Sequence, residues 1–116
     1  MQHDKQHYKM IVLSNPVEGR EVEYNHWYQY THLADIVSLP GFVSAQRYQL
    51  AQNMMVDAEA YRYMAIYEIE TDDLQRTLAG LVEAAETGAL VMSEALNTDT
   101  VHAVVYSTLG EVVRTL

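Results

Sequence analysis

Residues 23–48 read EYNHWYQYTHLADIVSLPGFVSAQRY, and the rest of the fold can be worked out from this stretch. Its first part predicts a helix that begins near residue 21, where acidic residues suit the positive end of the helix dipole. Apolar residues then recur at spacings of three and four, which places them on one helical face. These residues are Trp27, Tyr30, Ala34 and Val37, and Leu33 flanks them.

Pro40 and Gly41 end this helix and turn the chain into a strand. The residue before a proline is pushed out of the α region, and glycine tolerates the positive φ of an exit turn. Residues 42–50 follow as FVSAQRYQL, in which neither alternate set of side chains is cleanly polar. The sequence therefore predicts a strand here but leaves open which of its sides faces the helix.

Three further strands are predicted from apolar and β-branched runs bounded by turn residues. They cover residues 7–13, 61–70 and 101–108. A second helix is expected over residues 73–87, capped by Thr71 or Asp72 and ended by Gly88. Its expected buried stripe consists of Leu74, Leu78, Leu81, Val82 and Ala85. The sequence allows a short helix over residues 89–96. We expect residues 109–116 to form a tail that can pack on a neighbour.

The order strand, helix, strand, strand, helix, strand predicts one α+β domain over residues 1–116. It is typical of the ferredoxin-like βαββαβ fold, a four-stranded antiparallel sheet with both helices on one face. The second and third strands are apolar on both sides, so the face without helices needs a partner. We therefore expect a homodimer in which two sheets pack face to face as a dimeric α+β barrel.

Composition narrows the class of partner. The chain carries 16 acidic and 7 basic residues, a net charge of -9, which disfavours nucleic acid and anionic membranes as partners. It has no cysteine, which excludes a disulfide framework and thiolate metal sites. No apolar run comes near the roughly 18 residues of a membrane span, so a cytoplasmic protein is expected. Its nine tyrosines fit either ordinary packing or a tyrosine-lined pocket.

Several residues of the opening stretch resemble the signature of the EthD-like family of the dimeric α+β barrel superfamily. They are the pair Trp27 and Tyr28, then His32, Asp35, the run at residues 39–42 (LPGF) and the pair Arg47 and Tyr48. The resemblance implies a dimer with one small-molecule cleft per subunit, between the sheet and the helices. Members of the superfamily include cofactor-independent cyclases, isomerases, dehydratases and oxygenases, as well as haem-binding enzymes.

His32 is the leading candidate for a general acid or base. Tyr28 precedes it by one turn and Asp35 follows by almost one turn, so the three can share a face and form the catalytic group. A nearby carboxylate and a helix C-terminus would move the pKa of His32 upward from about 6.5. Asp35 would orient the ring. The alternative is that His32 only braces the junction between helix and strand.

A second set of residues is expected to bind substrate. It consists of His26, Tyr48, Tyr63, Tyr67, Tyr106 and Arg47. Tyrosine hydroxyls on strands can donate to a developing oxyanion, and an arginine can hold a carboxylate. Packing is the alternative for the tyrosines, and His26 can simply finish the helix surface. Arg47 and Arg62 can instead pair with Glu68 or Glu70.

No metal or other cofactor is predicted. His3 and His7 lie in the N-terminal segment, and the six-residue spacing of His26 and His32 does not align them on a helix. No phosphate loop, dinucleotide fingerprint or nucleophile elbow occurs.

The sequence thus predicts a cofactor-independent isomerase, cyclase, dehydratase or lyase that uses histidine-mediated proton transfer. Its substrate would be a small hydrophobic molecule of aromatic, polyketide-like or lactone type. Alternatives are a non-catalytic small-molecule binder or accessory protein, a cofactor-free oxygenase and a haem protein.

Overall fold

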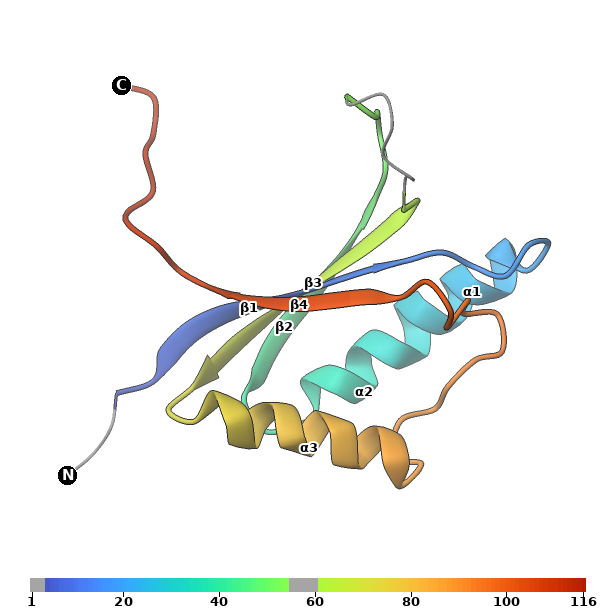
Figure 1. The fold of residues 1–116 in the computed structure, drawn as a ribbon, viewed down its shortest axis with the longest axis horizontal. Helices are drawn as coiled ribbons and strands as arrows, with labels where there is room; N and C mark the ends of the chain where they lie inside the picture. Colours follow the sequence, from blue (N-terminus) through green and yellow to red (C-terminus); the bar gives the residue numbers. More distant parts are fainter. Residues whose placement is uncertain (1–3, 55–60) are drawn as a thin grey trace.

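Four antiparallel strands form one sheet in the order β2-β3-β1-β4 in the computed structural model, which describes residues 4–54 and 61–116. The strands are β1 (Gln6–Ser14), β2 (Phe42–Gln49), β3 (Tyr63–Thr71) and β4 (His102–Ser107). The helical segments are α1 (Glu21–Trp27), η1 (Tyr28–His32), α2 (Leu33–Val37) and α3 (Leu74–Glu86). All the helical segments cover one face of the sheet (Figure 1), so the predicted ferredoxin-like α+β fold is confirmed.

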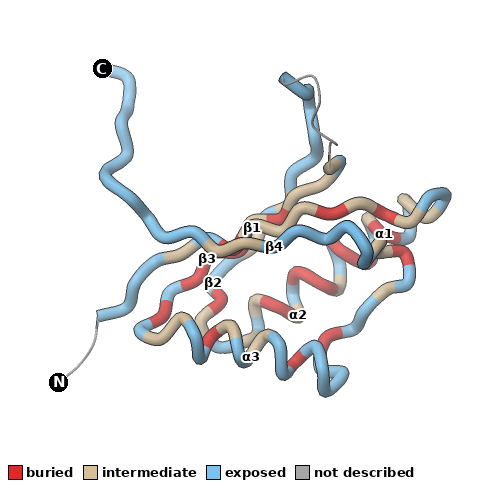
Figure 2. The backbone as a smooth tube through the Cα atoms, in the orientation of Figure 1, coloured by how far each residue is buried: buried red, intermediate tan, exposed pale blue. Residues whose placement is uncertain are grey.

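The strand register decides the question of sidedness that the sequence left open. Met10 stands opposite Tyr67 and Val105, and these side chains point to the helices and belong to the core. Ile11 stands opposite Ile66 and Val104 on the other side of the sheet. Figure 2 shows buried segments on the sheet and on the helices, where the two layers face one another.

The first helix is continuous from α1 through α2, but its central turn is a π-helix. A π turn holds one residue more than an α turn and so rotates the helix face that follows it. The buried residues are consequently Tyr24, Trp27, Tyr28, His32, Leu33 and Ile36. The predicted stripe is wrong for Tyr30, which is 73% exposed, and for Ala34, which is also exposed.

Helix α3 begins one residue later than predicted. Asp73, rather than Thr71 or Asp72, is the N-cap, and its side chain accepts a hydrogen bond from the Arg76 backbone N–H at 3.1 Å. Gly88 ends the helix with a φ of +80°, as predicted. Val82 and Ala85 are exposed, contrary to the predicted stripe, whereas Thr77 and Ala84 are buried.

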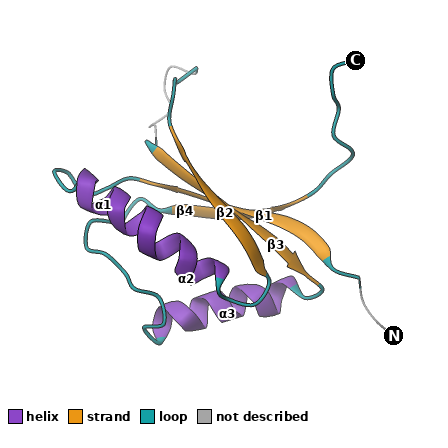
Figure 3. Ribbon diagram, turned by 180° about the vertical axis from the view of Figure 1, so that it is seen from behind, coloured by secondary structure: helices purple, strands orange, loops and turns teal. Residues whose placement is uncertain are grey.

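Residues 89–96 contain no helix, so the expected short helix is wrong. The segment instead runs beside the loop that follows β1. The Val17 N–H donates to the Ala95 carbonyl at 2.6 Å, and the Asn97 N–H donates to the Asn15 carbonyl at 3.1 Å. Figure 3 shows this connection passing around the end of α3 to reach β4.

The face of the sheet away from the helices is apolar at its centre. Its central side chains are Ile11, Leu13, Met64, Ile66 and Val104, all half-buried in the single chain. His7 and Lys9 lie beside Glu68 at one end of this face, and each has a nitrogen 2.5 Å from a Glu68 carboxylate oxygen. We call the five apolar side chains Ile11, Leu13, Met64, Ile66 and Val104 the outer patch. No helix in the described residues is long and apolar enough to cross a membrane.

Candidate functional site

A hollow of about 480 Å³ opens between the first helix and the neighbouring ends of β2 and β3. Helix residues line one side of it and strand residues line the other. The lining consists of Asn25, His26, Gln29, Tyr30, Arg47, Tyr48, Gln49 and Tyr63. We call it the Arg47 hollow. Its volume falls in the range of pockets that hold small molecules in proteins.

Arg47 projects from β2 toward the helix and is half-buried. Its Nη2 donates to Asn25 Oδ1 at 2.6 Å, and its Nη1 reaches the Asn25 backbone carbonyl at 3.4 Å. The guanidinium carbon lies 4.8 Å from the centre of the Tyr28 ring, 5.4 Å from that of Tyr63 and 5.6 Å from that of Tyr24. The predicted ion pair of Arg47 with Glu68 or Glu70 is not formed, because those side chains lie on the opposite side of the sheet.

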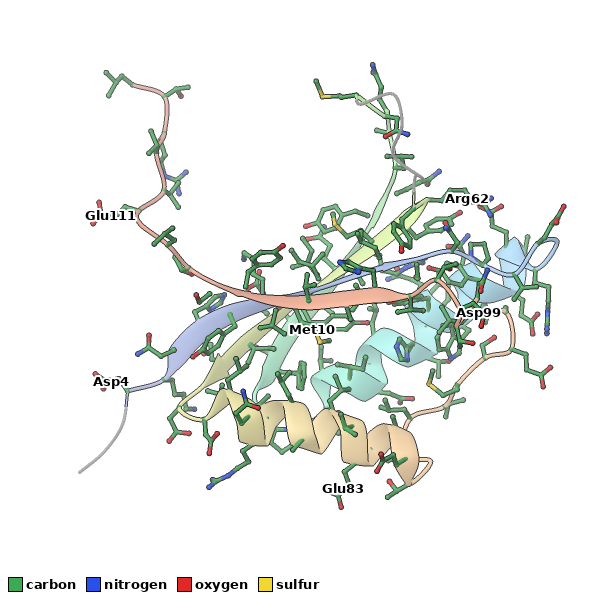
Figure 4. The ribbon with its side chains drawn as sticks, viewed as in Figure 1. Asp4, Met10, Arg62, Glu83, Asp99 and Glu111 are labelled. Carbon is green, nitrogen blue, oxygen red and sulfur yellow. The ribbon has the colours of Figure 1, made fainter. Side chains whose placement is uncertain are left out.

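Tyr63 is the second strand residue of the hollow, and its hydroxyl is held from two sides. It donates to Glu21, and it accepts from Asn25 Nδ2 at 3.1 Å. The same Glu21 carboxylate accepts from Arg62 Nη1 at 3.0 Å. Arg62 thus pairs with Glu21, whereas the expected partner was Glu68 or Glu70. Figure 4 shows Arg62 next to the start of β3.

A group of buried tyrosines lies directly behind Arg47. Tyr24 is fully buried and its hydroxyl is 2.5 Å from Ser14 Oγ. Tyr67 donates a long hydrogen bond of 3.5 Å to the Tyr28 hydroxyl. Burial raises the pKa of Tyr28 to about 12 and raises the pKa of Tyr67 further. These phenols therefore stay protonated near neutral pH and act as hydrogen-bond donors rather than bases.

His32 lies deeper than the hollow and does not line it. The imidazole stacks on Trp27 with ring centres 4.5 Å apart and meets the Tyr28 ring edge-on at 5.0 Å. Burial lowers the pKa of His32 to about 4, against the weaker opposite effect of Asp35. The predicted rise was wrong because desolvation of the imidazolium outweighs the attraction of one carboxylate. Its buried Nδ1 has no hydrogen-bond partner among the described residues.

Asp35 has a different partner from the one predicted. Its Oδ2 accepts from the Val91 backbone N–H at 3.1 Å, while Trp27 Nε1 donates to the Val91 carbonyl at 2.6 Å. The backbone N–H and the carbonyl of Val91 are therefore both hydrogen-bonded to side chains of the first helix. Asp35 thus holds the segment between α3 and β4 against the first helix. It makes no hydrogen bond to His32.

The remaining predicted residues divide between two sides of the sheet. His26 lines the Arg47 hollow, with its ring centre 5.0 Å from that of Tyr30. Tyr48 also lines the hollow from the edge strand β2, although it stands opposite Met64, on the side of the sheet away from the helices. Tyr106 is 59% exposed and stands opposite Lys9, on the side away from the helices. The structure therefore does not bring Tyr106 to the site.

Four lining residues, Asn25, Gln29, Tyr30 and Gln49, were not among the predicted site residues. A signal for the three on the helix was present, because Asn25 and Gln29, and also His26 and Tyr30, are four apart and so share neighbouring positions on a helix. The contact of Asn25 with Arg47 could not be predicted from the chain, since it depends on which side of β2 faces the helix.

A second hollow of about 590 Å³ lies on the other side of His26. Its one arginine, Arg20, is already paired with Glu23 at 2.8 Å and lies 3.8 Å from Glu94. No cluster of three or more metal-ligating side chains of the His, Cys, Asp and Glu types occurs within residues 4–54 and 61–116. His3 lies outside the described residues.

The fold and the Arg47 hollow define a ferredoxin-like α+β protein with a cavity of small-molecule size. A candidate monooxygenase from Shewanella loihica PV-4 has the same fold, with a TM-score of 0.55 and 18% identity over 96% of this chain and 98% of its own. An EthD family protein from Bacillus halodurans C-125 matches with a TM-score of 0.51 and 17% identity over 89% of this chain and 99% of its own. No family model matches the sequence, and no curated protein matches it.

Proposed function

We propose that this chain is an EthD-like, cofactor-independent enzyme that moves a proton on a small hydrophobic molecule bound in the Arg47 hollow. The observation that carries the proposal is the convergence of an imidazole, a guanidinium and a phenol on one cavity of about 480 Å³. A reaction of the isomerase or lyase type needs a group that transfers the proton and donors that stabilise the charge left on the substrate. The hollow offers both.

Arg47 is the donor in this proposal. Its guanidinium is held in place by Asn25, and Asn25 is in turn held by Tyr63, so the donor does not have to be reorganised when charge develops. Donors fixed before the reaction contribute most to the stabilisation of a developing oxyanion.

Two imidazoles compete for the role of proton carrier. His32 is the residue predicted from the sequence, but its ring lies behind the hollow and is a weak base with a pKa of about 4. His26 lines the hollow itself. Because reach comes before pKa in choosing a general base, the proposal assigns the proton transfer to His26, with His32 holding Trp27 and Tyr28 in position.

The test follows proton exchange by ¹H NMR in D₂O with two probes, α-angelica lactone and 2-tetralone, whose carbon acids exchange through an enolate. We expect His26→Asn to slow the catalysed exchange by roughly 100-fold, the usual scale for losing a general base, and His32→Asn to slow it much less. The reverse ranking would return the role to His32. Exchange that is no faster with protein than without it, together with a thermal shift on probe binding, would make the chain a non-catalytic binder.

A cofactor-free oxygenase is the second candidate, favoured by the likeness in fold to the candidate monooxygenase. It would consume O₂ in the presence of an electron-rich aromatic probe such as 1,8-dihydroxyanthrone. An oxygen electrode distinguishes it from the proton-transfer enzyme, which consumes none.

A further inference from the structure

Arg47 differs from most other cations of the described residues. Four of them have a carboxylate oxygen within 4.0 Å, in the pairs Lys9 with Glu68, Arg20 with Glu23, Arg62 with Glu21, and Arg76 with Asp73. Lys5 and Arg114 have no such partner among the described residues, but both are exposed in the terminal segments. Among the described residues Arg47 has no such partner, although the whole chain has 16 acidic side chains. A half-buried charge without a counter-charge is costly, so its retention calls for an explanation.

The tyrosine rings around Arg47 do not supply the missing negative charge. They lie over the guanidinium and attract it through their faces, an interaction worth much less than a buried ion pair. The N–H groups at the edge of the guanidinium are only partly used, since Asn25 is their one hydrogen-bond partner among the described residues. An arginine fixed in this way can still form paired hydrogen bonds with a carboxylate.

Arg47 also lines the cavity, so an anion bound there would not have to displace a protein carboxylate. The nearest acid of the network, Glu21, already binds Arg62 and Tyr63. With a net charge of -9 the chain as a whole repels small anions, so recognition of an anion requires a local cation of this kind.

The rest of the hollow suits an aromatic body attached to that anion. His26 and Tyr30 line it from the first helix, and the flat faces of such rings favour stacking with an aromatic ligand. We propose that the Arg47 hollow binds a small aromatic carboxylate, with the carboxylate on Arg47 and the ring among these side chains. This inference rests on the proposed function only in taking the hollow as the substrate site.

The test compares 2-naphthoate with its neutral analogue 2-naphthamide by isothermal titration calorimetry. Wild-type protein is expected to bind the carboxylate roughly 10- to 100-fold more tightly than the amide, the range for a charge-assisted pair of hydrogen bonds. Arg47→Met is expected to abolish this preference while still binding the amide. Arg47→Lys should keep part of the preference, since an ammonium retains the charge but not the planar fork.

Arg76→Met is the matched control, because it removes one positive charge from an exposed side chain of α3, away from the hollow. It should leave the preference for 2-naphthoate unchanged. Amide NMR spectra of the titrated protein should shift at Asn25 and Gln49, and shifts centred instead on Met92 and Ser93 would place the ligand in the second hollow.

The outcomes separate the two proposals. Equal binding of the two probes by wild-type protein, or a preference that survives in Arg47→Met, overturns the carboxylate inference and leaves the proton-transfer proposal standing. Failure of both probes to bind overturns the inference and also the use of the hollow as an aromatic site. Thermal unfolding of each variant shows that it is folded, and Arg47→Gln replaces Arg47→Met if the latter is not.

Discussion

His32 shows how one buried side chain can couple the stability of this protein to pH. Its ring is 8% exposed, lies between Trp27 and Tyr28, and has an Nδ1 atom without a partner among the described residues. Charging it in the folded protein would place an imidazolium in an apolar site. Burial therefore lowers its pKa from the ordinary 6.5 to about 4.

The folded protein should lose stability as the pH falls from about 6.5 toward 4, because the unfolded chain then binds a proton that the folded chain refuses. Above this window His32 is neutral in both states and contributes nothing. The difference in pKa corresponds to a loss of about 2 kcal/mol in the free energy of unfolding between pH 7 and pH 5. Urea unfolding at a series of pH values measures it.

The variant His32→Asn should flatten this pH dependence, whatever its effect on stability at neutral pH. His26→Asn is the control, because His26 is exposed and its removal should leave the slope as in the wild type. An unchanged slope in His32→Asn would show that its imidazole titrates normally.

For single residues, the sequence predicted which side chains line the hollow better than it predicted the hydrogen-bond partner of each one. His26, Tyr48, Tyr63 and Arg47 were predicted at the site, and all four line the hollow. The partners of Asp35 and Arg62 were wrong, since Asp35 binds Val91, from a segment 56 positions away, and Arg62 binds Glu21. Contacts between segments so distant are set by tertiary packing, which local spacing does not record.

At the scale of elements, the turn between the first helix and β2 depends on Gly41. Its φ is +90°, a left-handed conformation, and a Cβ placed on it would meet the Thr77 side chain at 2.8 Å. Its carbonyl accepts from the Glu70 N–H at 2.9 Å, which joins the turn to the end of β3. This glycine therefore fixes both the exit of the helix and its distance from α3.

Gly41→Ala should destabilise the protein by about 2 kcal/mol, from the cost of positive φ together with the close approach to Thr77. Gly80→Ala, inside α3, is the matched control, since a Cβ there meets nothing within 4 Å. It should stabilise the protein by roughly 0.5 to 1 kcal/mol, because alanine is the better helix former. Denaturant unfolding of both variants decides it, and equal effects would contradict the role given to Gly41.

The elements themselves were predictable, since each strand lies within two residues of its expected bounds. The face of the first helix was not. A pattern with a period of 3.6 residues assumes an unbroken α-helix, and the π turn at Tyr28–His32 moves the buried set from Tyr30 and Ala34 to His32 and Ile36. A π turn has no reliable sequence signal, so the change in the buried face of the helix could not be predicted. Such turns are frequent at functional sites, and this one lies beside the hollow.

At the scale of the whole molecule, the outer patch sets the state of assembly that we propose. Helices cover the other face of the sheet, and no helix or strand within residues 4–54 and 61–116 lies over Ile11, Ile66 and Val104. The Lys9 and Glu68 pair at the end of the same face would set the direction in which a second sheet could approach. Apolar surface of this kind on a sheet is typical of an interface, and a second copy supplies an equally apolar surface.

Sedimentation tests the homodimer that is expected from the sequence. Wild-type protein should sediment at twice the 13.2 kDa of one chain, and Ile66→Glu should sediment as a single chain, because each interface would bury two carboxylates in apolar surroundings. Val82→Glu is the matched control, since Val82 is an exposed residue of α3 on the helical side, and its variant should stay dimeric. A wild-type protein that sediments as one chain at tens of micromolar would refute the dimer. An Ile66→Glu variant that stays dimeric would move the interface elsewhere.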